Sequence, residues 1–480
     1  MDINFITILL IVNILLAGIL IFIEKRDVAA TWAWLMILLF IPIVGFLLYL
    51  FLGRQLKQKN FYHLSNKERS YLQLAVTNQA NQIHNDQRFI QDELLSKHSQ
   101  LIMMNLKSAN ALLTTENEIQ TFSDGYEKFN SLFEDIQNAE KEINIQYYII
   151  QRDSLGKKLR DELTKKAEKG VKVRVLYDDI GSKKITPSFF KDLIKHGGEV
   201  KAFFPSFLRL INFRLNNRNH RKLCIIDGRV AYIGGFNVGD EYLGIDKKFG
   251  YWRDTHFRIK GDSVNQIQGR FILDWQQATK QHGHIIEEFT FNNVESIRNT
   301  PIQIVASGPN SETEHLKNMY VKLITSAKQS VYIQTPYFVP DASIMDACKI
   351  AALSGIDVRI MIPSKPDHPF VHWASLSYVG ELLSYGAKIL LYENGFLHAK
   401  TIVIDQEVAS VGTTNIDTRS FKLNFEINAI VYSEKESSNL QNLFLSDCKY
   451  SSELTLEKYQ ARTIFIKIKE AISRLLSPIL

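Results

Sequence analysis

The feature that most constrains the fold of this 480-residue chain is an internal repeat that follows residue 120. Three β-rich segments occur twice in the same order: 142–149 with 331–338, 170–177 with 355–362, and 198–204 with 386–392. The glycines that begin the last two pairs lie 185 residues (355 minus 170) and 188 residues (386 minus 198) apart. In each case a helix-ending glycine precedes alternating apolar residues, which is typical of a helix leading into a strand. The nearly constant offset predicts an α/β fold of two duplicated lobes that pack face to face.

A short motif, H-x-K-x-x-x-x-D, occurs once in each half. Its two copies are His220, Lys222 and Asp227, and His398, Lys400 and Asp405. The histidines lie 178 residues apart (398 minus 220), close to the repeat offset, and each copy is followed by a glycine turn and an asparagine, Asn237 or Asn415. A single copy is a weak signal, but two copies at equivalent places in a repeat predict a duplicated catalytic site.

The spacing within the motif suits attack on phosphorus. Side chains two residues apart project from the same face of a strand, so each histidine lies beside its lysine. A neutral imidazole is nucleophilic near neutral pH, and the lysine offsets charge on phosphoryl oxygens. A single buried histidine is more often a core residue. The duplicated pair favours the catalytic interpretation instead.

The carboxylates divide into two groups. Asp227 and Asp405 complete the catalytic motif, but each lies an odd number of residues from its histidine and begins a turn. They are therefore poor partners for those histidines, and we expect them to stabilise the hairpins. Asp254 and Glu426 lie on strand-like segments with apolar neighbours, so we predict that they fix the histidine tautomers.

The N-terminus contains two uncharged runs, residues 3–23 and 28–52, each long enough to span a bilayer. Only Glu24–Asp27 separates them. A cleaved signal peptide needs a basic start and a shorter apolar core. Residues 1–54 are therefore predicted to form two transmembrane helices, with a buried hairpin of a soluble fold as the alternative.

The basic residues Arg54, Lys57 and Lys59 follow the second run, which favours a cytoplasmic main body. Three scattered cysteines argue for a reducing compartment, and without a C-x-x-C pair a thiolate zinc site is not expected. The net charge of +6 is compatible with binding to anionic lipid but is not a strong indication of nucleic-acid binding.

The remaining boundaries follow from these segments. We predict a linker and helical lead-in over 55–120, a first lobe over 121–300 and a second lobe over 301–453. Residues 454–480 form a basic, apolar tail. Its end, 464–480, is predicted either to lie in a membrane interface or to dock on the protein as a helix.

The chain resembles the phospholipase D superfamily from about residue 121 to the C-terminus, because that superfamily joins two such motifs at the interface of two lobes. Within it, the chain is similar to bacterial cardiolipin synthases. The segments that carry this closer resemblance are the N-terminal hairpin with Phe40–Gly45, Tyr147–Tyr148, Trp252–His256, Ser307–Pro309, Gln334–Phe338, Gly412–Phe421 and Arg474–Pro478.

The resemblance implies mixed sheets flanked by helices and a reaction that needs no metal or other cofactor. Two phosphatidylglycerols would be joined into cardiolipin with release of glycerol. It further implies that His220 attacks phosphorus and His398 acts as acid and base, while Lys222, Lys400, Asn237 and Asn415 contact phosphoryl oxygens. The expected partners are phosphatidylglycerol and anionic membrane lipids, not nucleic acid.

Alternatives stay open at this point. Water as the acceptor would give a phospholipase D-type hydrolase, and serine as the acceptor would give a phosphatidylserine synthase. A lipid-binding membrane scaffold is the alternative outside the enzymes, and two intact motifs argue against it.

Overall fold

The computed structural model describes residues 3–22, 28–49, 61–62, 64–85, 92–206, 216–281, 289–291, 299–311 and 313–477. The connection Glu24–Asp27, the basic residues Arg54, Lys57 and Lys59, and the last three residues of the C-terminal tail lie outside the described residues.

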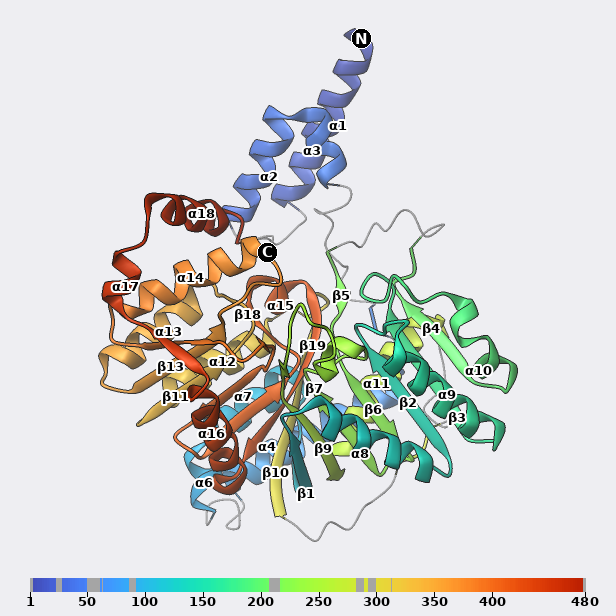
Figure 1. Cartoon of the computed structure of the whole chain (residues 1–480). Helices are drawn as coiled ribbons and strands as arrows, with labels where there is room; N and C mark the ends of the chain where they lie inside the picture. The colour runs from blue at the N-terminus through green and yellow to red at the C-terminus, as the bar shows by residue number, and fades with distance from the viewer. Residues whose placement is uncertain are drawn as a thin grey trace.

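One mixed β-sheet runs through both halves of the chain (Figure 1). Its middle is the antiparallel pair β1 and β10, and the strands on the two sides follow the same order outward. On the first side these are β1 (Leu113–Phe122), β9 (His256–Gly261), β7 (Val230–Gly234), β6 (Leu223–Ile226), β2 (Glu142–Tyr147), β3 (Lys172–Asp178) and β4 (Glu199–Phe203). On the second side they are β10 (Asn299–Ser307), β19 (Asn424–Tyr432), β17 (Val408–Gly412), β16 (Thr401–Ile404), β11 (Ser330–Gln334), β13 (Asp357–Pro363), β14 (Lys388–Tyr392) and β20 (Ser451–Leu454).

Strand direction is repeated as well. β2, β3 and β4 are parallel, as are β11, β13 and β14, whereas β6 and β16 run antiparallel to β2 and β11. The flanking helices are α8 (Gly125–Asn138), α9 (Ser154–Glu168), α10 (Lys191–Lys195) and α11 (Ser263–Thr279) in the first half, and α12 (His315–Ser326), α13 (Ala342–Leu353), α14 (Pro369–Leu383) and α16 (Glu434–Cys448) in the second. This arrangement confirms the predicted α/β fold with mixed sheets and duplicated halves, but the halves join edge to edge through β1 and β10 in one sheet and do not pack face to face as predicted.

Alternation along the strands places apolar side chains on both faces of the sheet. In β6, Leu223 and Ile225 pack in one core with α11, whereas Cys224 and Ile226 pack in another with α8 and α9. The core with α11 also contains second-half side chains such as Ile427. The two halves therefore share a core and do not bury their apolar surface separately.

The segment predicted as linker and lead-in, 55–120, contains α4 (Asn66–Asn85), α6 (Glu93–Lys97), α7 (Ser99–Ala109) and most of β1. The sequence did not predict β1, because much of this central strand is polar and its place depends on pairing with β9 and β10. The helices also pack on the second half instead of leading into the first. Leu101 and Ile102 are buried in its core, and Gln303 donates to the Ile102 carbonyl at 3.1 Å.

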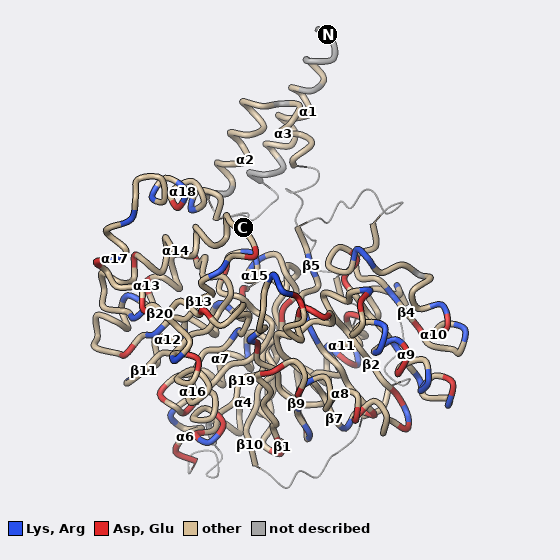
Figure 2. Tube along the Cα trace, viewed as in Figure 1, with Lys and Arg blue, Asp and Glu red and all other residues tan. Residues whose placement is uncertain are grey.

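The N-terminal runs form α1 (Ile3–Phe22), α2 (Val28–Phe40) and α3 (Pro42–Leu48). The second run is two helices and not the single helix predicted over 28–52, because Pro42 has no N–H to continue the bonding of α2 and instead starts α3. Figure 2 shows these helices without charged residues. Judged on length and apolarity, none of the helices in the described ranges qualifies as a membrane span. Asn13 Nδ2 donates to the Leu38 carbonyl at 3.1 Å, which links α1 to α2.

The hairpins that follow the two motifs have equivalent turns. Asp227 and Gly228 have φ of 52° and 63°, and Asp405 and Gln406 have φ of 53° and 60°. Glycine adopts this left-handed region without a Cβ penalty, whereas glutamine does not. The second turn therefore carries strain that the first avoids.

We expect Gln406→Gly to raise the free energy of unfolding by about 1 kcal/mol and Gly228→Ala to lower it by a similar amount. The weak bond from Ser438 Oγ to Gln406 Oε1, at 3.4 Å on the surface, is lost at little cost. Denaturant unfolding of the purified, detergent-solubilised chain measures both changes. A Gln406→Gly variant that is no more stable than the parent would contradict this account of the turn.

Candidate active site

Two short strands carry the motif histidines across the boundary between the halves. β5 (Arg218–Asn219), just before His220, pairs with the start of β19. β15 (Phe396–Leu397), just before His398, pairs with β8 (Trp252–Arg253). The backbone N–H of His220 donates to the Phe425 carbonyl at 2.9 Å, and that of His398 donates to the Arg253 carbonyl at 2.7 Å. Each histidine is therefore held by the residue that precedes a carboxylate of the other half.

The histidine side chains meet those same carboxylates. His220 Nδ1 lies 2.9 Å from the carboxylate of Glu426, and His398 Nδ1 lies 2.6 Å from Oδ2 of Asp254. Both carboxylates are fully buried. An Nδ1–H donated to a carboxylate fixes the tautomer and leaves the Nε2 lone pair for attack. The structure thus places the two predicted orienting residues on the histidines, but each on the histidine of the opposite half.

Two further residues contact or make room for the carboxylates, and the sequence analysis did not identify them. Thr413 donates its Oγ1 hydrogen to Glu426 at 2.6 Å. At the equivalent place in the first half is Gly235, where an added Cβ would lie 1.9 Å from Oδ1 of Asp254. The sequence did contain a signal for these two residues. Gly-Gly follows the first motif and Gly-Thr follows the second, so the two copies differ at the position of Gly235 and Thr413.

Aromatic rings enclose both imidazoles. Tyr148 packs its edge against His220 with ring centroids 4.8 Å apart, and Trp252 lies 5.2 Å from His398. Both aromatic residues had been noted in the sequence only through the family resemblance. Their rings help to remove water from around the histidines, which strengthens electrostatic interactions at the site.

Burial determines the protonation states of the motif histidines and lysines. It lowers the pKa of His220 and of His398 to about 4, despite the neighbouring carboxylates, so both imidazoles are neutral near neutral pH. Burial also lowers the pKa of Lys222 to about 7 and that of Lys400 to about 8. Each lysine Nζ donates to the carbonyl of its own motif histidine, at 2.6 Å for Lys222.

The carboxylates stay ionised. Burial by itself raises the pKa of Asp254 and of Glu426, but the nearby cations and the histidine hydrogen bonds outweigh it and leave both pKa values below the usual range. For Asp254 the main opposing charge is Lys400, whereas for Glu426 the main opposing influences are its interaction and hydrogen bond with His220, followed by the charge of Lys222. The resting site therefore holds two neutral imidazoles, each hydrogen-bonded to a carboxylate.

The motif aspartates lie apart from the histidines, although the predicted catalytic set includes them. Asp227 accepts three backbone N–H bonds of 2.7–2.8 Å from residues 140–142, where β2 begins. Asp405 accepts three of the same length from residues 328–330, where β11 begins. The odd offset from histidine turns these side chains toward the backbone of the neighbouring strand, so the structure gives them a stabilising position.

The two motif asparagines are not equivalent. Asn237 accepts the Ile149 N–H at 3.1 Å and donates to the Tyr242 hydroxyl at 3.1 Å. Asn415 is also buried, but its Oδ1 has no hydrogen-bond partner among the described residues. The predicted contact of both side chains with phosphoryl oxygens stays a prediction.

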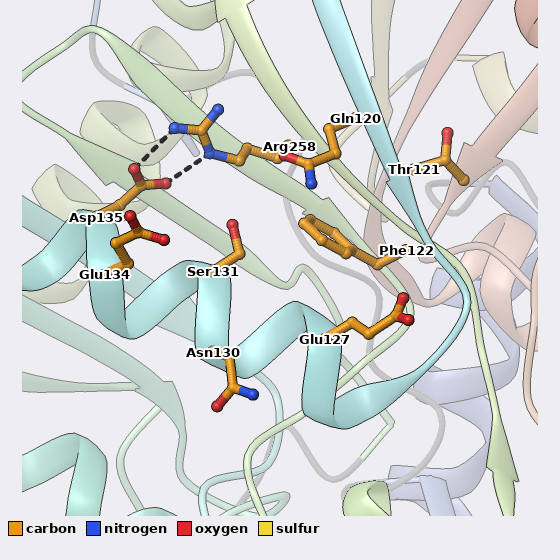
Figure 3. A pocket seen from close by; sticks show the side chains of 9 residues that line it. All are labelled: Gln120, Thr121, Phe122, Glu127, Asn130, Ser131, Glu134, Asp135 and Arg258. Carbon is orange, nitrogen blue, oxygen red and sulfur yellow. Dashed lines mark hydrogen bonds and ion pairs between the residues drawn. The ribbon is translucent and has the colours of Figure 1, made fainter.

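A surface pocket of about 610 Å³ lies beside α8 and β9 (Figure 3). None of the motif residues lines it. Its one arginine, Arg258, donates to Asp135 at 2.7 Å through both Nε and Nη2, and the Tyr232 hydroxyl donates to the same carboxylate. The one cation of this pocket is thus paired with Asp135.

Comparisons with known proteins find similar sequences over nearly the whole chain. Residues 132–272 and 320–448 match the family described as "Cardiolipin synthase, PLD-like domain", and residues 5–54 match "Phospholipase_D-nuclease N-terminal". The chain is 51% identical over 473 residues to a cardiolipin synthase of Listeria monocytogenes serotype 4a (strain HCC23), with 98% of each chain covered. It is 52% identical over 470 residues to the major cardiolipin synthase ClsA of Bacillus subtilis (strain 168), again with 98% of each chain covered.

Among solved structures, the chain is similar to phosphatidylserine synthase of Haemophilus influenzae Rd KW20. The TM-score is 0.61 at 14% sequence identity, over 79% of this chain and 100% of that one. At this identity the similarity shows the fold alone.

We expect Asp254→Asn and Glu426→Gln each to lower kcat by a factor on the order of 10²–10⁴, because the amide keeps the shape but does not stabilise an imidazolium. Asp405→Asn is the matched control. Its loss of backbone hydrogen bonds should lower the free energy of unfolding by about 1–3 kcal/mol while the folded enzyme keeps its kcat within a few fold. Steady-state kinetics and unfolding of the same preparations separate the two effects. An unchanged kcat in Asp254→Asn or Glu426→Gln would refute the orienting role.

The rate constant kcat/KM should fall as pH rises, with a midpoint between the pKa values of about 7 for Lys222 and about 8 for Lys400. Deprotonation removes the positive charge that offsets the phosphoryl oxygens, whereas the nucleophile His220 stays neutral at any pH well above about 4. A pH–rate profile between pH 5 and 10 measures this. Lys222→Arg, if active, should extend the profile to higher pH because arginine stays charged. A profile that rises through pH 9 would contradict the lysine assignment.

Proposed function

The chain belongs to the cardiolipin synthase family of phospholipase D-like enzymes, and we propose that His220 and His398 are the two catalytic groups of its reaction. The protein is a phosphatidyltransferase that joins two phosphatidylglycerols into cardiolipin and releases glycerol through a phosphohistidine. The observation that carries the residue assignment is the duplicated pair in which a histidine of one half donates Nδ1–H to a buried carboxylate of the other.

In the first step, Nε2 of His220 attacks the phosphorus of one phosphatidylglycerol. An N–P bond forms while the P–O bond to the headgroup glycerol breaks, and His398 gives a proton to the departing oxygen. The bound phosphodiester anion raises the pKa of His398 above its value in the free enzyme, and Asp254 stabilises the resulting imidazolium.

In the second step, His398 is neutral and accepts the proton of a free hydroxyl on the second phosphatidylglycerol. The oxygen of that hydroxyl attacks the phosphorus, the N–P bond to His220 breaks, and cardiolipin leaves. When cardiolipin leaves, His398 releases this proton to solvent, and it takes up another when the phosphodiester of the next phosphatidylglycerol binds beside it. Glu426 holds His220 in the reactive tautomer throughout.

The lysines supply the charge that both steps need. Lys222 and Lys400 each lie two residues after a histidine, just before β6 and β16, and the charge of Lys400 contributes to the lowered pKa of Lys222. A phosphodiester between the histidines stabilises both ammonium groups, which in turn offset the charge that develops on the phosphoryl oxygens.

The membrane arrangement is the second part of the proposal. The uncharged helices α1, α2 and α3 anchor the chain in the bilayer, and the catalytic lobes lie on the cytoplasmic side. Three observations support this: the uncharged runs of residues 3–23 and 28–52, the match of residues 5–54 to a phospholipase D-type N-terminal family, and the basic residues that follow. The bond from Asn13 Nδ2 to the Leu38 carbonyl gives this amide nitrogen a partner inside such a hairpin.

Product analysis with labelled phosphatidylglycerol tests the assignment. The parent should yield cardiolipin and glycerol, whereas His220→Ala and His398→Ala should each lose activity by a factor of about 10⁴ or more. His196→Ala, which changes a partly exposed histidine after α10, should retain the parent rate. Unchanged activity in either motif variant would refute the two-histidine site.

Peptide mapping under alkaline conditions, which preserve phosphohistidine, identifies the nucleophile after brief exposure to lipid labelled at phosphorus. Label on the peptide that contains residue 220 is the expected result. Label on the peptide that contains residue 398 would reverse the roles of the two histidines.

A further inference from the structure

The C-terminal helix α18 (Ile464–Leu475) presents its apolar face to the outside. The side chains on this face are 48–82% exposed: Ile464 64%, Phe465 74%, Ile468 48%, Ile472 50% and Leu475 82%. At 3.6 residues per turn, their spacing confines them to a sector of about 100°. They form one continuous apolar stripe, which we call the α18 stripe.

The opposite face of α18 faces the protein and is mixed, with the half-buried Ile466 between the polar residues Glu470 and Ser473. Glu470 and Ser473 are only 3% and 1% exposed, and Arg462 Nη2 donates to Glu470 Oε2 at 2.8 Å. Arg474 bonds Glu381 of α14 at 2.6 Å, so ion pairs fix the helix against the second half. A surface helix of a soluble domain buries its apolar face and exposes its polar face. The inverted arrangement of α18 indicates that something other than this chain covers the stripe.

Charge indicates what covers it. Lys467 and Lys469 flank the stripe on its two sides, because they lie about 60° before and about 40° beyond the apolar sector. Lys469 Nζ lies 5.2 Å from the Trp373 ring centroid, so its side chain passes along the surface of α14. Apolar side chains bordered by lysines match the boundary between acyl chains and anionic headgroups.

The position of α18 in the molecule is consistent with contact between this helix and a membrane. It lies toward the end of the molecule from which α1, α2 and α3 project, and β5 and α15 (Thr418–Lys422), next to the site, lie toward the same end (Figure 1). Figure 2 shows charged residues on α18 but none on α1–α3. Phe370, at the start of α14, adds a 56% exposed ring on the helix that supports α18.

We propose that α18 lies in the interface of an anionic bilayer and makes a second membrane contact, separate from the N-terminal helices. One membrane contact does not define the orientation of the lobes, whereas a second contact fixes which end of the lobes faces the lipid. The inference extends the proposed function by assigning the bilayer-facing surface, and it does not depend on the roles of the histidines.

A second copy of the chain fits the stripe less well than a bilayer. A two-fold contact between stripes would bring the flanking lysines of both copies close together, where like charges repel. One short helix face also buries less than the roughly 800 Å² per partner of a stable interface.

An environment-sensitive fluorophore on a single cysteine tests the proposal in the full-length chain. The background is Cys448→Ser, because Cys224 and Cys348 are buried and only Cys448 is partly exposed. Phe465→Cys probes the stripe. The matched control is Tyr126→Cys, at a 50% exposed position on α8.

The labelled proteins are reconstituted into vesicles of phosphatidylglycerol and phosphatidylcholine with brominated acyl chains. The probe at position 465 should shift to the blue and be quenched at least twofold relative to unbrominated vesicles, whereas the probe at 126 should not respond. Equal responses at 465 and 126 would overturn the proposal. A blue shift at 465 that bromine does not quench and that grows with protein density would also overturn it, in favour of a second copy.

A functional arm uses Phe465→Glu with Ile468→Glu. We expect KM for vesicle phosphatidylglycerol to rise about tenfold while the unfolding midpoint is unchanged, since both side chains are already exposed. The probe reports depth without turnover. An inactive chain with a quenched probe would therefore count against the proposed function alone, and an active chain with an unquenched probe would count against the α18 contact alone.

Discussion

The exchange of carboxylates between the two halves is the constraint on which the rest of the structure depends. Glu426 is 206 residues from His220, and Asp254 is 144 residues from His398. Neither half contains a complete histidine–carboxylate pair of its own. The halves must therefore meet in one relative position, and the continuous sheet through β1 and β10 with its shared core fixes that position.

Burial at this junction decides the chemistry. Water exclusion makes each imidazole neutral, while ionised carboxylates fix both tautomers and two lysines lie beside them. Burying an isolated charge away from water costs free energy, so charged residues around the site form compensating ion pairs. Arg221, between His220 and Lys222, points away from the site and bonds Asp274 at 2.6 Å, and the Tyr62 hydroxyl donates to the same carboxylate at 2.6 Å. The second motif has buried Ala399 at the equivalent place, and Asp447 of the second half is instead paired with Arg253 at 2.9 Å.

The same junction connects the site to the N-terminal part of the chain. Phe61 stacks on Phe425 with ring centroids 5.0 Å apart, and Phe425 precedes Glu426 in β19. The segment after the uncharged helices thus contacts the strand that carries a histidine-orienting carboxylate. An enzyme whose substrates are lipids gains from such coupling, because the lobes and the bilayer must keep one orientation for the headgroup to reach the histidines.

The sequence by itself determined the features that depend on local periodicity. Glycines at equivalent offsets ended helices and began strands, and the two-residue spacing put each motif lysine close to its histidine, although both pairs lie just before β6 and β16 and not within a strand as predicted. The parity argument likewise turned Asp227 and Asp405 away from the histidines. Only the tertiary structure decided the features that depend on contacts between distant segments: which carboxylate serves which histidine, the central place of the polar strand β1, the packing of α7 on the second half, and the outward apolar face of α18. Spacing along a chain fixes which side chains share a face, whereas strand pairing and packing across more than a hundred residues fix which faces meet.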